Sequence, residues 1–308
     1  MSVAMDRPRR RETPLRLTVT RFLDHRAALA SAVVLVVLVL LALAAPLAEH
    51  AMGLDANEVD LLNRFAAPSA THPLGTDELG RDMALRLMYG DQVSLFAGLA
   101  SALLAAVIGT LIGLPAGYFG GWLDSLLMRL TDSVIALPLL PLLIVMAAID
   151  LNKLGVPPEI ATSPNVSLYR IVLIIALVGW TTVARLVRGA ALSLRERAFV
   201  LAAIAQGAGP MTVMFRHILP NAISPIIVAT TLSVGAIILL ESVLSFLGLG
   251  IQPPIASWGN MLTNAQDMIY EAPALAVFPG LAIFATVIAF NFLGDGLQDA
   301  LDPKAFRE

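Results

Sequence analysis

Residues 93–117 read VSLFAGLASALLAAVIGTLIGLPAG, an apolar stretch without a charged side chain. A helix needs ~20 mostly apolar residues to cross a bilayer, so this stretch predicts a membrane span. Working outward from it, five further stretches meet the same criterion: residues 27–47, 126–149, 171–189, 221–247 and 274–294. The sequence therefore predicts an all-α integral membrane protein with six transmembrane helices.

The composition of the 308-residue chain supports this prediction. Hydrophobic residues make up 57% of the chain and charged residues 14%, whereas ordinary globular domains have ~45–50% and ~25%. This excludes a soluble enzyme that is surrounded by water on every side. The net charge of −3 leaves no basic excess for phosphates, so no nucleic-acid partner is expected. The absence of cysteine excludes disulfides, thiolate catalysis and Cys-ligated metals.

The distribution of Lys and Arg predicts the orientation in the membrane. Fourteen of them lie in segments on the side of the N-terminal tail and five on the opposite side. Because cytoplasmic segments carry the excess, both termini are expected in the cytoplasm. The first span could instead be a secretory signal, since arginines precede it and Ala42-Leu43-Ala44 resembles a cleavage site. Its apolar run exceeds the ~7–15 residues of a signal sequence, and five spans follow.

This topology divides the chain into consecutive segments. The expected order is a cytoplasmic Arg-rich tail (1–26), a first transmembrane helix (27–47), an extracytoplasmic segment (48–92), a five-helix core (93–294) that includes a cytoplasmic loop (190–220), and a cytoplasmic C-terminal tail (295–308).

Small residues recur every four positions in the span 93–117. They form a stripe along which another helix backbone can approach closely, and they are Ser101, Ala105, Gly109, Gly113 and Gly117. Packing inside the bundle and an interface with another subunit are both open. Prolines 138, 141 and 225 predict kinks in two other spans.

The loop 190–220 reads AALSLRERAFVLAAIAQGAGPMTVMFRHILP. Ser193 and Glu196 predict a capping box, Gly207 predicts the positive φ that ends a helix, and Pro210 suits the first turn of a second short helix. An apolar face is expected on that second helix, formed by Met211, Met214 and Phe215. The loop is thus expected to be a helix-turn-helix that can enter a groove of a partner.

The same loop resembles the EAA loop of ABC importer membrane subunits, which docks into the ATPase subunits. The resemblance rests on Ala202-Ala203, Gly207 and Leu219-Pro220. It implies a set of ATPase-coupling residues: Ala202, Ala203, Gly207, Met211, Phe215, Leu219 and Pro220. The chain departs from the family pattern at four positions. Leu201 stands where Glu is common, Ile204 and Gln206 stand where Arg and Leu are often found, and His217 stands at the usual Ile position. These departures concern particular polar contacts and leave the docking role in place.

Three further segments resemble the C-type permease subunits of dipeptide and oligopeptide importers. They are HPLGTDELGRD (72–82), ESVLSFLGLG (241–250) with SWG (257–259), and FPG (278–280) with NFLGDGL (291–297). The likeness covers residues 70–303, and the chain is identified as a member of that branch. The resemblance implies a type I ABC importer (MetI-like) permease fold in a bacterial inner membrane.

The resemblance also implies partners and a cargo. The partners are a homologous B-type permease subunit, two ATPase subunits that hold ATP and Mg, and an extracytoplasmic substrate-binding protein. No cofactor is expected on this chain itself. Peptides are the expected cargo, with glutathione or nickel chelates as alternatives.

The residues separately argue against ATP hydrolysis by this chain. A Walker A loop needs Gly-Lys followed by Ser or Thr, but Lys153 follows Asn152 and Lys304 follows Pro303. The chain is therefore expected to be a non-catalytic translocation subunit.

Charged residues in and near the spans supply pathway candidates. Glu241, with Ser245 and Phe246, is a candidate for the pathway or gate, because an intramembrane carboxylate is a functional hypothesis by default. Its place near the outer edge of the fifth span leaves a snorkelling or helix-end role open. Arg129 and Asp132, three residues apart, predict an ion pair on one helix.

The outer segment 77–82 is acidic but lacks the spacing of a calcium loop. An ordered lip at the mouth of the bundle, or a contact for a binding protein, is expected instead of a metal site. The four histidines are scattered, so neither a metal cluster nor a Ser-His-Asp triad is expected.

Two rival classes remain to be tested. An ion-coupled secondary transporter would need ionisable groups near the bilayer midplane, where the spans offer few. An intramembrane hydrolase would need a paired nucleophile and base at depth.

Overall fold

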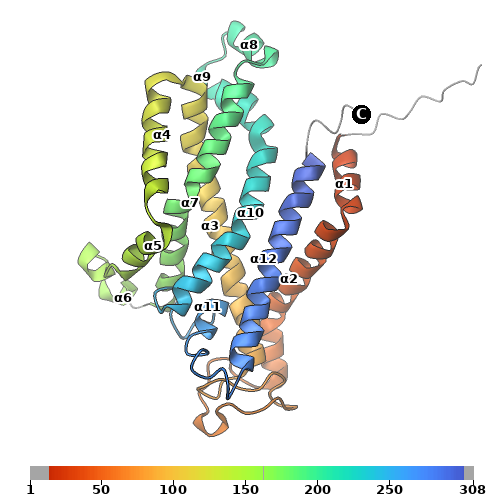
Figure 1. The fold of residues 1–308 in the computed structure, drawn as a ribbon, viewed down its shortest axis with the longest axis vertical. Coiled ribbons are helices and arrows are strands. Elements are labelled where there is room, and N and C mark those ends of the chain that lie inside the picture. Colours follow the sequence, from red (N-terminus) through yellow and green to blue (C-terminus); the bar gives the residue numbers. More distant parts are fainter. Residues whose placement is uncertain (1–13, 162, 302–308) are drawn as a thin grey trace, which may run out of the picture.

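The computed structural model describes residues 14–161 and 163–301, which form an elongated bundle of helices (Figure 1). The longer helices are α1 (Pro14–Asp24), α2 (Arg26–Met52), α3 (Met83–Phe119), α4 (Gly121–Ala136), α5 (Leu139–Ala148), α7 (Pro164–Leu194), α8 (Ala198–Ala205), α10 (Leu219–Phe246) and α12 (Ala274–Leu301). Short helical turns connect them: η1 (Leu61–Asn63), η2 (Leu151–Leu154), α6 (Pro158–Ala161), α9 (Pro210–Thr212), η3 (Val213–Ile218) and α11 (Trp258–Met261).

Five of the six expected spans are single helices that are long and apolar enough to cross a membrane. They are α2, α3, α7 from Asn165, the continuous helix Pro210–Phe246, and α12. Their bounds exceed the expected ones, most of all for α3, which begins at Met83 because Asp82 caps it by accepting from the Leu85 amide at 2.8 Å.

The sixth expected span, 126–149, is a broken pair of helices. α4 and α5 meet at an angle of 86°, so the prediction of one kinked helix is wrong in its geometry. The cause is local: Pro138 restricts the preceding residue to extended backbone, and Leu137 adopts φ −76° and ψ 137° there. The six-span count therefore holds only if this pair is taken as one span.

α3 is the central helix, and α2, α7 and α10 pack on it. The small-residue stripe of α3 lies against α7 of the same chain. A Cβ added at Gly109 would lie 2.6 Å from the Trp180 carbonyl oxygen, and one added at Gly113 would lie 2.3 Å from that of Ala184. The stripe is thus used inside the bundle, so it is not available to a second subunit.

The two ends of the bundle are built differently (Figure 1). α8 projects from one end, where α1 and the last turn of α12 also lie. The segment between α2 and α3, together with α11, closes the opposite end. α1 is an unexpected feature, because the segment 1–26 was expected to be a simple tail; it packs against α12.

Candidate functional site

The loop that joins α7 to α10 begins with a tight corner. The expected capping box at Ser193 and Glu196 is wrong, because α7 continues to Leu194 and α8 begins only after Arg197, whose side chain makes no capping bond. Arg195 fixes this corner instead: its guanidinium donates to the carbonyl oxygens of Gly117 and Tyr118 at 3.3 and 3.4 Å. The corner is therefore held by the end of α3.

The bend between α8 and α9 has the expected chemistry. Gly207 has φ +86°, and its amide donates to the Ile204 carbonyl while the Ala208 amide donates to that of Ala203. This pair of bonds is a Schellman motif, which ends a helix at a residue in left-handed conformation. Pro210 then begins α9 directly after Gly209, as predicted.

The second helix of the loop is not separate from the fifth span. α9, the π-helical turn η3 and α10 form one continuous helix from Pro210 to Phe246. Pro220 explains the π turn, because it lacks an amide and its ring would clash with the carbonyl of residue 216 in a regular α-helix. The expectation of a short helix followed by a new span is thus corrected: displacement of the bend acts directly on α10.

Apolar side chains cover the tip of the loop and are exposed. Phe199, Leu201, Ile204 and Met211 are 44%, 54%, 43% and 69% exposed. Met214, which was expected beside Met211 on the same face, is buried at 2% exposure instead. It packs with Val200, Val213 and Ile218 in the core that supports the loop.

The expected coupling residues divide into three groups. Ala202, Gly207 and Met211 lie exposed on the tip. Ala203 is buried beneath it. Phe215 and Leu219 line an apolar groove of about 650 Å³ between α3 and α10, and Pro220 is exposed beside them.

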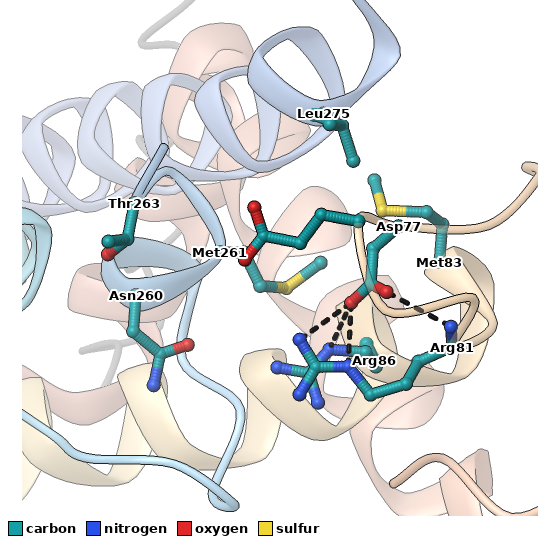
Figure 2. Close-up of a pocket in the computed structure, with 9 residues that line it drawn as sticks. Asp77, Arg81, Met83, Arg86, Asn260, Met261, Thr263 and Leu275 are labelled. Carbon is teal, nitrogen blue, oxygen red and sulfur yellow. Dashed lines mark hydrogen bonds and ion pairs between the residues drawn. The ribbon is translucent and has the colours of Figure 1, made fainter. Parts of the chain in front are cut away.

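The segment 77–82 is ordered, as expected for a lip, and the residues from His72 onward belong to the same ordered turn structure. Asp77 accepts from Arg81 at 2.8 Å and lies 3.4 Å from the Arg86 guanidinium of α3 (Figure 2). Asp82 caps α3 and also lies 3.0 Å from His72 Nδ1. Its acidic side chains thus bind the lip's own cations and helix end, and the described residues contain no cluster of three or more metal-ligating side chains.

Glu241 is fully buried near the C-terminal end of α10 and does not face solvent. Its carboxylate accepts from the Ser245 hydroxyl at 2.7 Å and lies 3.4 Å from the Ser94 hydroxyl of α3. The Ser94 hydroxyl in turn accepts from the Trp258 amide at 3.1 Å, and the Ser245 hydroxyl accepts from the Ile251 amide at 3.0 Å. This Glu241 network therefore attaches the outer loop to two helices. Phe246 lies at the end of α10 and is 38% exposed.

Ser94 and Trp258 belong to the Glu241 network but were not identified from the sequence. Trp258 is completely buried, and its amide reaches a serine 164 residues away in the chain. A contact at such separation leaves no periodic pattern in a single sequence. The only local signal was the polar residue inside the apolar span.

The ion pairs of α4 also differ from the expected pair of Arg129 with Asp132. Asp132 pairs with Arg185 of α7 instead. About two turns closer to the start of α4, Asp124 accepts two hydrogen bonds from Arg188 of α7, at 2.5 and 2.7 Å. Packing of α4 on α7 thus brings opposite charges closer than the spacing along α4 does.

Comparison with known proteins gives consistent matches over almost the whole chain. Residues 109–307 match the family described as "Binding-protein-dependent transport system inner membrane component", and residues 13–68 match the "N-terminal TM domain of oligopeptide transport permease C". The chain is 42% identical over 295 residues to the glutathione transport system permease protein GsiD of Pectobacterium atrosepticum, covering 95% of this chain and 92% of that protein.

Two further similarities agree with these matches. The chain is 39% identical over 292 residues to the dipeptide transport system permease protein DppC of Alkalihalophilus pseudofirmus, covering 95% of this chain and 90% of that protein. Its fold resembles a chain of the MetNI methionine ABC transporter in inward-facing conformations, with a TM-score of 0.54 at 19% identity. That likeness covers 70% of this chain and 97% of the other.

Proposed function

The chain belongs to the family of binding-protein-dependent transport system inner membrane components, and from this membership we propose that it is the C-type permease subunit of an ATP-driven importer. It pairs with a homologous B-type permease subunit around a shared pathway. Two ATPase subunits dock inside the cell, and an extracytoplasmic binding protein delivers the substrate outside. The chain is a multi-pass membrane permease; the assembly around it is the proposal.

The exposed tip of the loop supports the coupling role. It presents Phe199, Leu201 and Met211 to solvent on a rigid helical support at one end of the bundle (Figure 1). Exposed apolar side chains on a short helix suit a groove on a partner protein. The core beneath them, with Val200 and Met214 buried, lets the tip be pushed without unfolding.

The continuous helix Pro210–Phe246 supplies the mechanism. Closure of the ATPase pair on ATP displaces the tip, and α10 carries this movement through the membrane to the outer loop. The permease then opens outward, and ATP hydrolysis resets it. This chain holds no ATP or Mg and changes no bond of the substrate; it couples one movement to another.

The cargo proposed is a dipeptide or short oligopeptide. The relatives named above are described as transporting dipeptides and glutathione, and glutathione is itself a peptide. Nickel chelates are the alternative cargo in this branch. The choice rests mainly with the binding protein, so measuring the ligand of a binding protein encoded beside this gene identifies the substrate class.

Gly207→Asp tests the coupling role. Nothing lies within 4 Å of a Cβ at this position, and Asp is among the residues that tolerate the left-handed backbone of Gly207, so the variant is expected to insert and fold, while its charge faces the docking groove. We expect a several-fold loss of ATPase co-purification and of vanadate-sensitive uptake in the co-expressed importer. Gly207→Asn is the matched control, because it has nearly the same size and also tolerates left-handed backbone but carries no charge.

Two results would contradict the proposal. Full coupling in Gly207→Asp would refute docking at this bend. Uptake by this chain alone that is abolished by a proton ionophore and insensitive to vanadate would favour an ion-coupled transporter instead.

A further inference from the structure

The ion pair between Asp132 and Arg185 lies on an exposed face of two helices that belong to candidate membrane spans. At about 1.5 Å of rise per residue, Asp132 lies about 17 Å along α4 from Gly121, and Arg185 lies about 14 Å along α7 from Leu194. Both residues fall within stretches that are apolar enough to cross the membrane. Their side chains are nevertheless 59% and 52% exposed.

A third charge lies on the same face. Arg129 is exposed; its carbonyl oxygen accepts from the Ser133 hydroxyl at 2.8 Å, but its guanidinium has no hydrogen-bond or ion-pair partner among the residues that the structure describes. It lies on one side of α4 with Ser125, Asp132 and Ala136, at the spacing of successive helical turns. On the adjoining surface of α7, Thr182 is exposed beside Arg185. We call these residues of α4 and α7 the polar face.

Lipid is a poor neighbour for the polar face. Charged side chains in spans face the bundle interior or a water-filled cavity, because hydrocarbon cannot solvate them. Ser125 alone could lie against lipid, since its hydroxyl donates to the Gly121 carbonyl of its own helix at 3.0 Å. The Asp132 carboxylate is poorly suited to lipid, because its short side chain cannot reach a distant interface as a long arginine can.

The neighbouring surface of α4 has the opposite character. Leu126 and Leu130 are 55% and 52% exposed, and their side chains carry no polar group. This apolar face suits lipid. A helix with one charged and one apolar exposed face stands at a boundary between water and lipid or protein, which places the polar face toward an aqueous space.

We propose that the polar face lines the water-filled route of the substrate, and that Asp132 and Arg129 contact the ammonium and carboxylate groups of a zwitterionic, peptide-like solute. This inference rests on the proposed transport function. It assigns this part of the route to α4 and α7; Glu241, which is buried, is not part of the polar face. The Asp132–Arg185 pair supplies fixed charges of both signs, so the wall repels neither end of the solute.

The absence of cysteine in the chain makes the test direct. Ala136→Cys and Thr182→Cys place single thiols on the polar face, and Leu130→Cys places one on the apolar face of α4, about 9 Å nearer the Gly121 end than Ala136. In inverted vesicles holding the co-expressed importer, we expect a membrane-impermeant thiol reagent to modify the first two several-fold faster than the third. Modification of Ala136→Cys is also expected to block ATP-driven transport of enclosed substrate out of the lumen, which is the import direction in an inverted vesicle, whereas treated Leu130→Cys retains this transport. Ala136→Ser is the control for the substitution itself, because serine has nearly the size of cysteine but no thiol that the reagent can modify.

The outcomes separate this inference from the proposed function. Equal rates for Ala136→Cys and Leu130→Cys, or no modification of Ala136→Cys and Thr182→Cys in resting or vanadate-trapped vesicles, would place the polar face against lipid or the partner permease and overturn the inference. Selective modification combined with vanadate-insensitive uptake would support the aqueous face and refute ATP coupling.

Discussion

Glu241 is the residue through which α10, α3 and the outer loop are joined. It is completely buried, and its carboxylate is the common acceptor for two serine hydroxyls. The same hydroxyls accept the amides of Trp258 and Ile251. Removing the carboxylate therefore weakens more than its own two contacts, because the serines lose the acceptor that orients them toward the loop.

Glu241→Ala is expected to lower the stability of the outer loop. Loss of a buried hydrogen-bond partner costs about 1–3 kcal/mol, and we expect a lower unfolding temperature in detergent together with faster proteolysis between residues 247 and 257. Glu241→Gln keeps the size and one acceptor oxygen, so its loss should be smaller. Equal melting and equal proteolysis of Glu241→Ala and the parent would show that the network does not hold the loop.

What the sequence predicted at the residue scale was local chemistry. The positive φ of Gly207 and the helix start at Pro210 follow from the residue itself, and both predictions are confirmed. The capping box at Ser193 failed because the contact of Arg195 with the end of α3, more than seventy residues away, determines where the corner lies. The role of Glu241 in the pathway stays a prediction, since its burial describes one conformation.

At the scale of elements, the contact between α3 and α7 is the most extensive in the described bundle. Gly109, Gly113 and Gly117 let the backbones touch, since each added Cβ would lie within 2.6 Å of an α7 backbone oxygen. Recurrence of small residues was enough to predict a close helix contact from the sequence, but it did not specify the partner helix. Which helix packs on α3 depends on the fold of the whole chain.

Gly113→Ala is expected to separate α3 from α7. Its Cβ would lie 2.3 Å from the Ala184 carbonyl oxygen, which belongs to a backbone that cannot rotate away. Overpacking of this kind costs about 1–3 kcal/mol, so the unfolding temperature in detergent should fall. Gly189→Ala on α7 is the matched control: nothing lies within 4 Å of its Cβ, and alanine favours helix by about 1 kcal/mol. A fall of similar size in both variants would contradict the packing argument.

The third span shows where prediction from hydropathy fails at this scale. An apolar run of sufficient length predicts a crossing, whatever the path of its backbone. Pro138 predicted a kink, but the 86° bend depends on α5 leaving α4 to pack on α7. The sequence predicted an ion pair between Arg129 and Asp132 for a similar reason, because it shows only the spacing along one helix. In the structure Arg185 of α7 pairs with Asp132 of α4, a contact between two helices.

At the scale of the whole molecule, the lip and the coupling loop lie at opposite ends (Figure 1). α3 has 37 residues, which corresponds to about 55 Å at the rise of an α-helix and exceeds the ~30 Å hydrocarbon core. The bundle therefore extends beyond the membrane on one side or both. In the proposed importer, coupling between nucleotide and substrate acts over this length, and the continuous helix Pro210–Phe246 runs from the loop 190–220 to the Glu241 network at the other end.

The orientation of this assembly is predicted from charge and is testable on the cysteine-free chain. Asp24→Cys places a thiol on α1, at the end that carries α8, and Ala70→Cys places one in the segment before the lip; both positions are exposed. Because the sequence assigns most of the basic residues to this side, that end is expected in the cytoplasm. An impermeant thiol reagent should modify Ala70→Cys in intact spheroplasts and Asp24→Cys only in inverted vesicles. The reverse pattern would place the coupling loop outside the cell, where ATPase subunits have no ATP, and the proposed mechanism would fail with it.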